Sequence, residues 1–363
     1  MILAIHPRGH GLHTVAFVDD DAPPRAKRLS SPVRGTNLPP ITCLAISESE
    51  DMLATGDHAG VVVVWELFSL SGDHEQPGDS EAEWVQTSVW APPSHEAGLA
   101  LGAWITGLQW QTKHTLVVGR YAGYVEVLDM KMGARGAAAT SFSNHAIGLT
   151  ALALGRRAGE LVRGYYDGRL FCHHALLYAP SAPVISPALM QTRVAVRAIW
   201  CVAGGEDRIL AGGADNVVRV WRRPAGPSST FRLLRWMLGT ESSQGVRALA
   251  ASREPDTGWV VAGCTRGVLL WRGWTPFTRG AGHPDLQGSI TSVHLCESDS
   301  VLVTSGPQPQ TPIAVWGLGP ENFVQLRRLE GSSALATVLA NRGLKTESVK
   351  EDDAETEPRP AER

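Results

Sequence analysis

The residue types that most often carry chemistry in proteins do not gather at a reactive spacing in this chain. His173 and His174 are adjacent, and adjacent residues of a strand point to opposite faces, so this pair cannot share a metal ion. The segment Gly9-His10-Gly11 begins a dinucleotide-binding pattern but lacks its third glycine, so we interpret it as a turn. The sequence contains no GxxxxGK[ST] phosphate loop and no GxSxG nucleophile elbow. We therefore expect no catalytic residues, no metal site and no cofactor, and hence a chain that is not an enzyme.

Cysteine usage and charge narrow the classes of partner. The five cysteines form no CxxC pair, and most lie inside apolar, strand-like runs. This pattern predicts buried, reduced thiols and a cytoplasmic or nuclear protein. A net charge of −3 gives no general attraction to nucleic acid or anionic membranes, and no apolar run reaches about 18 residues. The first residues are strand-like and lack the basic and long apolar regions of a signal peptide. We expect no nucleic-acid partner and no membrane partner.

The elements that must position any functional side chain are short strands joined by tight turns. Residues 208–222 are the clearest example, because apolar Ile209–Ala211 and β-branched Val217–Trp221 flank the turn residues Asp215-Asn216. Similar units recur along the chain, and their first strands start at intervals of 64, 44, 47, 50 and 44 residues. Four-stranded propeller blades repeat at about 40–50 residues. The second residues of these first strands are Thr42, Thr106, Thr150, Arg197, Arg247 and Thr291.

The hairpin at 208–222 resembles the centre of a WD40 repeat, with Asp215 six residues before Trp221. The resemblance covers roughly residues 1–340. It implies an all-β fold, a seven-bladed WD40-like β-propeller in which hydrogen-bonded His, Ser or Thr, Asp and Trp residues support each repeat. No repeat of this chain keeps the whole set. The fourth repeat has Ala211 at the Ser position, and the first has Ala59 where Asp is expected.

The third repeat departs further, with Arg163 at the Ser position and His173 at the Trp position. We therefore expect the blades to be held mainly by apolar packing between sheets.

Six complete units leave both ends of the chain to explain. Residues 2–5, 13–18 and 26–30 predict three strands of a seventh blade, and residues 333–340 predict its missing inner strand. We expect this C-terminal strand to pair with residues 2–5, because an open propeller would leave a row of unpaired backbone groups. The propeller domain would thus span residues 1–340. Residues 341–363 are polar and become rich in acidic residues, which predicts a disordered tail.

The first interval is long because of residues 69–103, an acidic insertion with several prolines and glycines. Residues 84–90 within it could form the outer strand of the blade. We interpret the insertion as a surface loop, and a contact with a partner through Trp84 or Trp90 is the alternative.

Arg197 and Arg247 are the strongest candidates for recognition. The family resemblance implies that their column of residues lies near the mouth of the central channel. Arginine forks match carboxylate and phosphate geometry, so the two residues could hold an acidic or phosphorylated peptide. The alternative is that both pair with loop carboxylates such as Glu206 or Glu254.

Four further candidates lie in or beside the turns between second and third strands, which would open on the same face. Aromatic and basic residues in such turns are common interface anchors, although packing at a strand end is an equally good interpretation of each. The four residues are His58, Tyr121, Tyr165 and Tyr166.

Taken together, the resemblance implies a non-catalytic scaffold or adaptor, a monomeric propeller within an intracellular multiprotein complex. Its partners would be other proteins bound at the channel mouth and loop faces. Val127–Lys131 resembles the Trp-Asp-x-Arg end of propellers that act as substrate receptors of cullin-type ubiquitin ligases, with Leu for Trp and Lys for Arg. That function is the alternative. A phosphoinositide-binding propeller is a distant one, because Leu326–Leu329 has Leu where the signature needs Gly.

Overall fold

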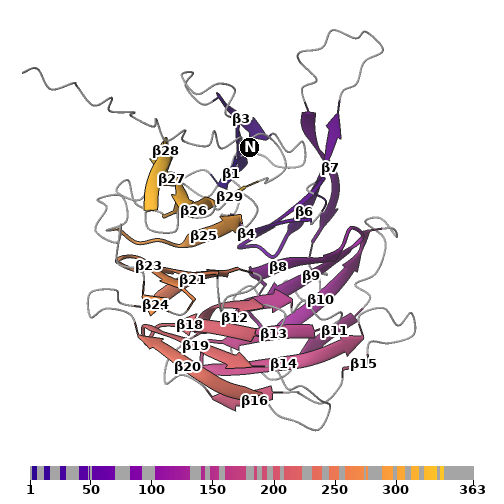
Figure 1. Cartoon of the computed structure of the whole chain (residues 1–363). Coiled ribbons are helices and arrows are strands. Elements are labelled where there is room, and N and C mark those ends of the chain that lie inside the picture. The colour runs from indigo at the N-terminus through magenta and orange to yellow at the C-terminus, as the bar shows by residue number, and fades with distance from the viewer. Residues whose placement is uncertain are drawn as a thin grey trace, which may run out of the picture.

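A computed structural model of the chain shows strands joined by turns and loops, and every regular element among its described residues is a strand (Figure 1). The described residues include no helix long and apolar enough to cross a membrane. They are 2–5, 12–16, 25–29, 41–47, 49, 51–69, 82–91, 103–130, 140–143, 148–154, 160–176, 184–185, 190–193, 199–204, 208–222, 231–238, 245–252, 258–273, 275–276, 288–296, 301–306, 312–318, 323–332 and 336–338.

The described strands form seven antiparallel sheets, here called blades 1 to 7. Blade 1 contains β4 (Ile41–Ile46), β5 (Met52–Asp57), β6 (Val62–Ser69) and β7 (Ala82–Trp90). Blade 2 contains β8 (Ile105–Thr112), β9 (Thr115–Arg120), β10 (Tyr124–Asp129) and β11 (Thr140–Ser143). Blade 3 contains β12 (Leu149–Leu154), β13 (Glu160–Tyr165), β14 (Arg169–Leu176), β15 (Val184–Ile185) and β16 (Met190–Arg193).

The remaining blades follow the same pattern. Blade 4 contains β17 (Ile199–Gly204), β18 (Arg208–Gly213), β19 (Val217–Arg222) and β20 (Arg232–Leu238). Blade 5 contains β21 (Val246–Ala251), β22 (Trp259–Cys264), β23 (Gly267–Arg272) and β24 (Thr275–Pro276). Blade 6 contains β25 (Ser292–Cys296), β26 (Val301–Ser305), β27 (Pro312–Leu318) and β28 (Phe323–Ser332). Blade 7 contains β29 (Ala336–Val338), β1 (Ile2–Ile5), β2 (Leu12–Ala16) and β3 (Arg25–Leu29).

From blade 1 to blade 7, the first strand of one blade packs against the first strand of the next. Contacts run from β4 to β8, β12, β17, β21 and β25 in turn, and β29 of blade 7 contacts β25 and β26. The blades therefore follow one another in chain order, as the colours of Figure 1 show. Sheets stacked in this way are those of a β-propeller, which confirms the predicted architecture.

Blade 7 combines both ends of the chain. β29 pairs antiparallel with β1, and Ile2, Leu3 and Ala4 lie opposite Val338, Thr337 and Ala336. β1 pairs with β2, and β2 with β3, so three N-terminal strands and one C-terminal strand share a sheet. The predicted pairing of the ends is confirmed. The predicted tail, residues 341–363, lies outside the described residues.

The core lies between neighbouring blades, because alternate residues of a strand point to opposite faces of its sheet. Val62 and Val64 pack with Ile105 and Leu116 of blade 2, whereas Val63 packs on the other face of blade 1. Equivalent clusters join blades 2 and 3, 3 and 4, 4 and 5, and 5 and 6. Apolar packing between sheets is thus the main support of the fold, as expected.

The hydrogen-bonded residues typical of the repeat make different contacts in different blades. In blade 6 the indole of Trp316 donates a hydrogen bond to the hydroxyl of Thr304 at 2.9 Å. In blade 1 the corresponding Thr55 hydroxyl instead donates to the carbonyl of Val63 at 3.4 Å. In blade 3, Arg163 at the Ser position is buried, and its guanidinium carbon lies 5.7 Å from the ring centre of Phe171.

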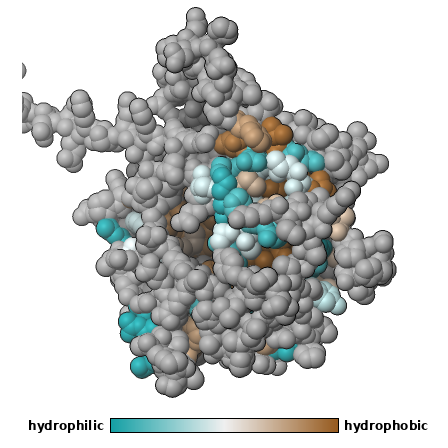
Figure 2. Space-filling view, turned by 90° about the vertical axis from the view of Figure 1, so that its right-hand side faces the viewer, coloured by the Kyte–Doolittle hydropathy of each residue, from teal (hydrophilic) through white to brown (hydrophobic). Residues whose placement is uncertain are grey.

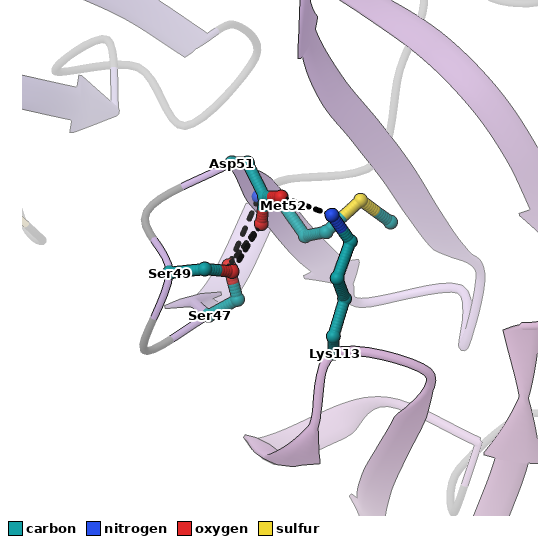
Figure 3. Close-up of polar contacts among 5 residues, drawn as sticks. All are labelled: Ser47, Ser49, Asp51, Met52 and Lys113. Carbon is teal, nitrogen blue, oxygen red and sulfur yellow. Dashed lines mark hydrogen bonds and ion pairs between the residues drawn. The ribbon is translucent and has the colours of Figure 1, made fainter.

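Blades 1 and 2 are joined on one side by an ion pair (Figure 3). Lys113, in the turn between β8 and β9, donates to the carboxylate of Asp51, which also accepts hydrogen bonds from the hydroxyls of Ser47 and Ser49. Partial burial raises the pKa of Asp51, but the bonds from Lys113, Ser49 and Ser47 outweigh burial and lower the pKa to about 2. Asp51 is therefore ionised throughout the physiological pH range.

Candidate interaction surface

The turns between the second and third strands of blades 1 to 3 form the candidate surface. Each of these turns is short, and in blades 1 and 3 an aspartate shapes the turn by accepting hydrogen bonds from backbone amides. In blade 3, Asp167 accepts from the amide of Arg169 at 3.1 Å. In blade 1, where Ala59 holds that position, Asp57 accepts from the amides of Ala59 at 2.9 Å and Val61 at 2.8 Å. Asp57 thus takes the role of the turn aspartate that the sequence lacks at Ala59.

A buried arginine connects the turns of blades 1 and 2. The guanidinium of Arg120 pairs with the carboxylate of Glu126 at 2.8 Å, and Arg120 is only 5% exposed. Its Nη1 donates to the backbone oxygens of Gly60 at 2.8 Å and Ala103 at 3.1 Å. A buried charge is tolerated when it is paired and its donors are satisfied, as here. Arg120 therefore fixes the turn of blade 1 against the start of blade 2.

Gly60 is required in this arrangement. Its φ of +84° lies in the left-handed region that residues with a Cβ rarely adopt. An added Cβ would lie 2.6 Å from the oxygen of Ala103 and 2.7 Å from Nη1 of Arg120. Gly60 therefore allows the backbone to approach Arg120 closely.

Three aromatic rings adjoin this network, since Trp104 follows Ala103 and Tyr121 follows Arg120 in the sequence. The ring of Trp104 is edge to face with His58, with centres 4.6 Å apart, and with Tyr121, with centres 4.5 Å apart. His58 is exposed, whereas Trp104 and Tyr121 are half-buried. The three residues come from the blade 1 turn, the approach to β8 and the blade 2 turn. They form one surface, although they lie far apart in the sequence.

The surface continues toward blade 3. The ring of Tyr121 packs beside Gly148, whose added Cβ would lie 3.0 Å from the ring. The oxygen of Gly148 accepts a hydrogen bond from the amide of Tyr166 at 2.9 Å, and the Tyr166 side chain is 58% exposed. We call His58, Trp104, Tyr121 and Tyr166 the aromatic strip. Trp104 was missed by sequence analysis, because it precedes its strand and lies outside any turn motif.

Tyr165 does not belong to the strip, and its predicted role as a surface contact is wrong. Its side chain is fully buried and packs edge to face with Phe171, with ring centres 5.3 Å apart. Tyr165 is the last residue of β13, so its ring points between blades, whereas Tyr166 begins the turn. Adjacent residues on a strand take opposite directions, which sequence position alone does not resolve.

Trp84 and Trp90 also prove to be core residues, which corrects the predicted partner contact. They belong to β7, so the prediction of an outer strand at 84–90 is confirmed. Trp84 packs with Leu53 and Trp65, and Trp90 packs on the opposite face against blade 2. The indole nitrogens of both residues are buried without a protein hydrogen-bond partner.

The large hydrophobic residues that blade 1 exposes are Phe68 on β6 and Val85 on β7, with exposed fractions of 44% and 43%. Figure 2 looks at the side of the molecule where these strands lie, and hydrophobic residues gather in its upper part. The rest of the predicted acidic insertion, residues 70–81 and 92–102, lies outside the described residues.

The predicted match between Arg197 and Arg247 is wrong. In the first strands of blades 1, 2, 3 and 5 the register skips one residue, which is Thr42, Thr106, Thr150 and Arg247 respectively. In blade 4 the shift falls between Ile199 and Cys201, so Trp200 holds this position. The blade 4 strand begins later than the sequence spacing suggested. Arg197 itself lies outside the described residues, and Arg247 is exposed, as expected.

The threonines at this position have a structural role. Thr106 donates to the oxygen of Gly119 at 3.3 Å, and Thr150 to that of Gly164 at 3.1 Å. Each hydroxyl thus satisfies a carbonyl where the bulge interrupts the ladder. The donor hydrogens of these two hydroxyls are therefore used within their own blades.

The described residues contain no group of three or more His, Cys, Asp or Glu side chains placed to hold a metal ion. Burial raises the pKa of the thiols of Cys43 and Cys264 to about 12. Both thiols therefore stay protonated and unreactive at physiological pH.

Comparison with known proteins agrees with the fold. Residues 30–66 match the family model described as "WD domain, G-beta repeat". A solved structure titled "Structure of U3-55K" has a TM-score of 0.60 and 16% identity, with 85% of this chain and 88% of that chain covered. A second, titled "Crystal structure of RRP9 WD40 repeats", has a TM-score of 0.62 and 15% identity, with 94% of this chain and 90% of that chain covered. None of the curated protein sequences compared matches the chain.

These similarities establish the fold. The chain has the β-propeller fold of WD40-repeat proteins, and its residues 30–66 carry the repeat itself.

Proposed function

We propose that this propeller is a non-catalytic scaffold that binds segments of partner proteins through the aromatic strip. The observation that carries the proposal is the contact of His58, Trp104 and Tyr121 with one another, next in the chain to residues that the buried Arg120 network holds. Rigid aromatic side chains that expose part of their surface lose little conformational entropy on binding and are frequent interface anchors. WD40 propellers are generally non-catalytic interaction modules, which agrees with the absence of a catalytic motif in the sequence.

The contacts of Arg120 and Gly60 favour a role of the strip in binding over a purely structural role. Arg120 and Gly60 hold the backbone of blades 1 and 2 in place, so the exposed ring of His58 can meet a partner without backbone rearrangement. We propose other proteins as partners, within an intracellular complex in the cytoplasm or nucleus. The protonated thiols of Cys43 and Cys264 are compatible with a reducing compartment.

The proposal is tested by affinity purification of the tagged full chain, followed by mass spectrometry. We expect His58→Ala with Tyr166→Ala to lose one or more partners that the unchanged chain retains, because both side chains are exposed and their removal leaves the core intact. Phe68→Ser is the matched control, since Phe68 is also exposed but lies outside the strip. Recovery of the same partners by all three proteins would reject the strip as the binding surface. Recovery of cullin-ligase subunits would instead support the alternative function of a substrate receptor.

A further inference from the structure

Three arginines lie side by side across blade 4. Arg208 of β18 lies opposite Arg222 of β19, which in turn lies opposite Arg232 of β20. Residues directly opposite in an antiparallel sheet share a face, and their Cβ atoms are about 4.5–5.5 Å apart. Like charges in this position repel each other and destabilise the sheet. The register therefore brings three arginine side chains together at one end of the blade.

Two of the three arginines, Arg222 and Arg232, are accessible to a ligand. Both side chains are exposed, whereas Arg208 is buried and only 5% of its surface is exposed. Within the part of the chain that the structure describes, no hydrogen bond, ion pair or ring contact joins the side chain of Arg222 or Arg232 to another residue. Three other described arginines differ in this respect: Arg120 pairs with Glu126, Arg169 with Asp167 and Arg219 with Asp215.

The repeat architecture does not require an arginine here. The register places Glu66 of blade 1, Asp129 of blade 2 and Gly317 of blade 6 at the position of Arg222. Blade 5 has Arg272 there, which lies 5.7 Å from the ring centre of Trp259. Charge at this position thus changes from acidic in blades 1 and 2 to basic in blades 4 and 5. A position that tolerates Glu, Asp and Gly is free to serve recognition.

The row ends at an unpaired sheet edge. β20 is the outermost strand of blade 4, and among the described strands it is hydrogen-bonded to β19 alone (Figure 1). Its residues Leu233 and Leu234 are 39% and 37% exposed beside Arg232. An edge strand presents unpaired amide and carbonyl groups to which an extended segment can add. Blade 4 therefore offers main-chain groups, apolar surface and unpaired positive charge in one place.

We propose that the outer edge of β20 binds an extended partner segment that alternates acidic and apolar side chains. The segment adds to blade 4 as a further antiparallel strand. A carboxylate opposite Arg232 is then placed on the face that carries Arg222, and an apolar side chain lies opposite Leu233. Carboxylates form charge-assisted hydrogen bonds with arginine and relieve the repulsion within the row. This surface is separate from the aromatic strip, so it extends the proposed function and does not depend on it.

Other anionic partners fit the edge less well. Single-stranded nucleic acid is held by aromatic stacking platforms beside a basic groove, whereas the exposed neighbours of Arg232 are aliphatic. A membrane surface offers no strand to complete the hydrogen bonds of β20. A protein segment is the one partner that satisfies the backbone edge, the leucines and the arginines together.

The test measures binding of a fluorescent eight-residue peptide of alternating Glu and Val to the full chain by anisotropy. We expect saturable binding, at least about tenfold weaker for Arg222→Glu with Arg232→Glu, because the substitutions remove both charge-assisted contacts. Arg266→Glu is the matched control, because Arg266 is exposed on blade 5 away from β20, and we expect it to leave binding unchanged. A control peptide of the same length that alternates Lys and Val should not bind.

Two further measurements check that the variants remain folded and that the peptide binds at β20. A comparison with other anionic partners then tests the partner class. Arg222→Gln with Arg232→Gln removes both charges without reversing them and should weaken binding in the same direction with an unchanged melting temperature. Hydrogen exchange of the β20 amides should slow when the peptide binds. Equal affinity for unchanged and substituted chains, or unchanged exchange at β20, would overturn the proposal. Tighter Arg222-dependent binding of a single-stranded oligonucleotide, or of vesicles containing phosphatidylserine, would overturn it in favour of that class.

Discussion

The hydroxyl of Thr42 lies 2.5 Å from the backbone oxygen of Ile105, the first residue of the next blade. The same hydroxyl lies 3.2 Å from the oxygen of Gly56 within its own blade. Gly56 in turn has no Cβ where one would lie 2.6 Å from Cγ2 of Ile105. One threonine and one glycine thus fix how closely blade 2 packs on blade 1.

Replacement of Thr42 tests this contact between the blades. Thr42→Val keeps the shape of the side chain but removes the hydroxyl, so we expect it to lower the free energy of unfolding by about 1 kcal/mol. Thr42→Ser retains the hydroxyl and should lose less. Urea denaturation of the full chain measures both variants. Equal stability of the Val and Ser variants would show that the hydrogen bond contributes nothing.

Arg120 and Glu126 form a buried pair whose loss should be costly. Arg120→Ala leaves the Glu126 carboxylate, 11% exposed, without its partner, and the expected loss in the free energy of unfolding is about 3–5 kcal/mol. The double variant Arg120→Met with Glu126→Leu removes both charges and should be less destabilised than Arg120→Ala. Thermal unfolding compares them. A double variant as unstable as the single one would mean that the backbone bonds to Gly60 and Ala103 carry the effect.

Asp51 gives the chain a defined acid dependence. Its folded pKa, about 2, lies below the 3.8 of the free side chain. A carboxyl whose pKa is lowered on folding contributes stability above the unfolded pKa and loses it as pH falls through the folded pKa. The stability difference between the unchanged chain and Asp51→Asn should therefore be constant above about pH 5 and disappear toward pH 2. A difference that persists at pH 2 would contradict the assigned pKa.

Closure of the propeller depends on β29. A chain that ends at Ser332 lacks this strand and leaves β1 without its inner partner. We expect it to aggregate or to lose its cooperative thermal transition, whereas a chain that ends at Lys345 should melt like the full protein. Calorimetry of the two truncations makes the comparison. Equal melting temperatures would show that the pairing of the two ends is dispensable.

The sequence predicts strands and turns here because their signals are local. The hairpin at 208–222 was predicted from β-branched residues around Asp215-Asn216, and Asn216 indeed adopts a positive φ of 62°. The face that a strand residue presents depends on the neighbouring sheet, and for that reason Trp84, Trp90 and Tyr165 were misplaced. The bulge at Trp200 moved the register by a few residues and removed the match between Arg197 and Arg247. The row of Arg208, Arg222 and Arg232 became visible only when the strand pairing was known.

The central claim, that partners bind the aromatic strip, is tested most directly by photo-crosslinking in cells. A benzoylphenylalanine in place of Tyr166 puts the reactive group on the strip, and one in place of Phe68 puts it on the exposed face of blade 1. We expect discrete crosslinked partner proteins from position 166, lost when His58→Ala is added, and none of the same partners from position 68. Crosslinks of those partners from position 68 with none from position 166 would contradict it.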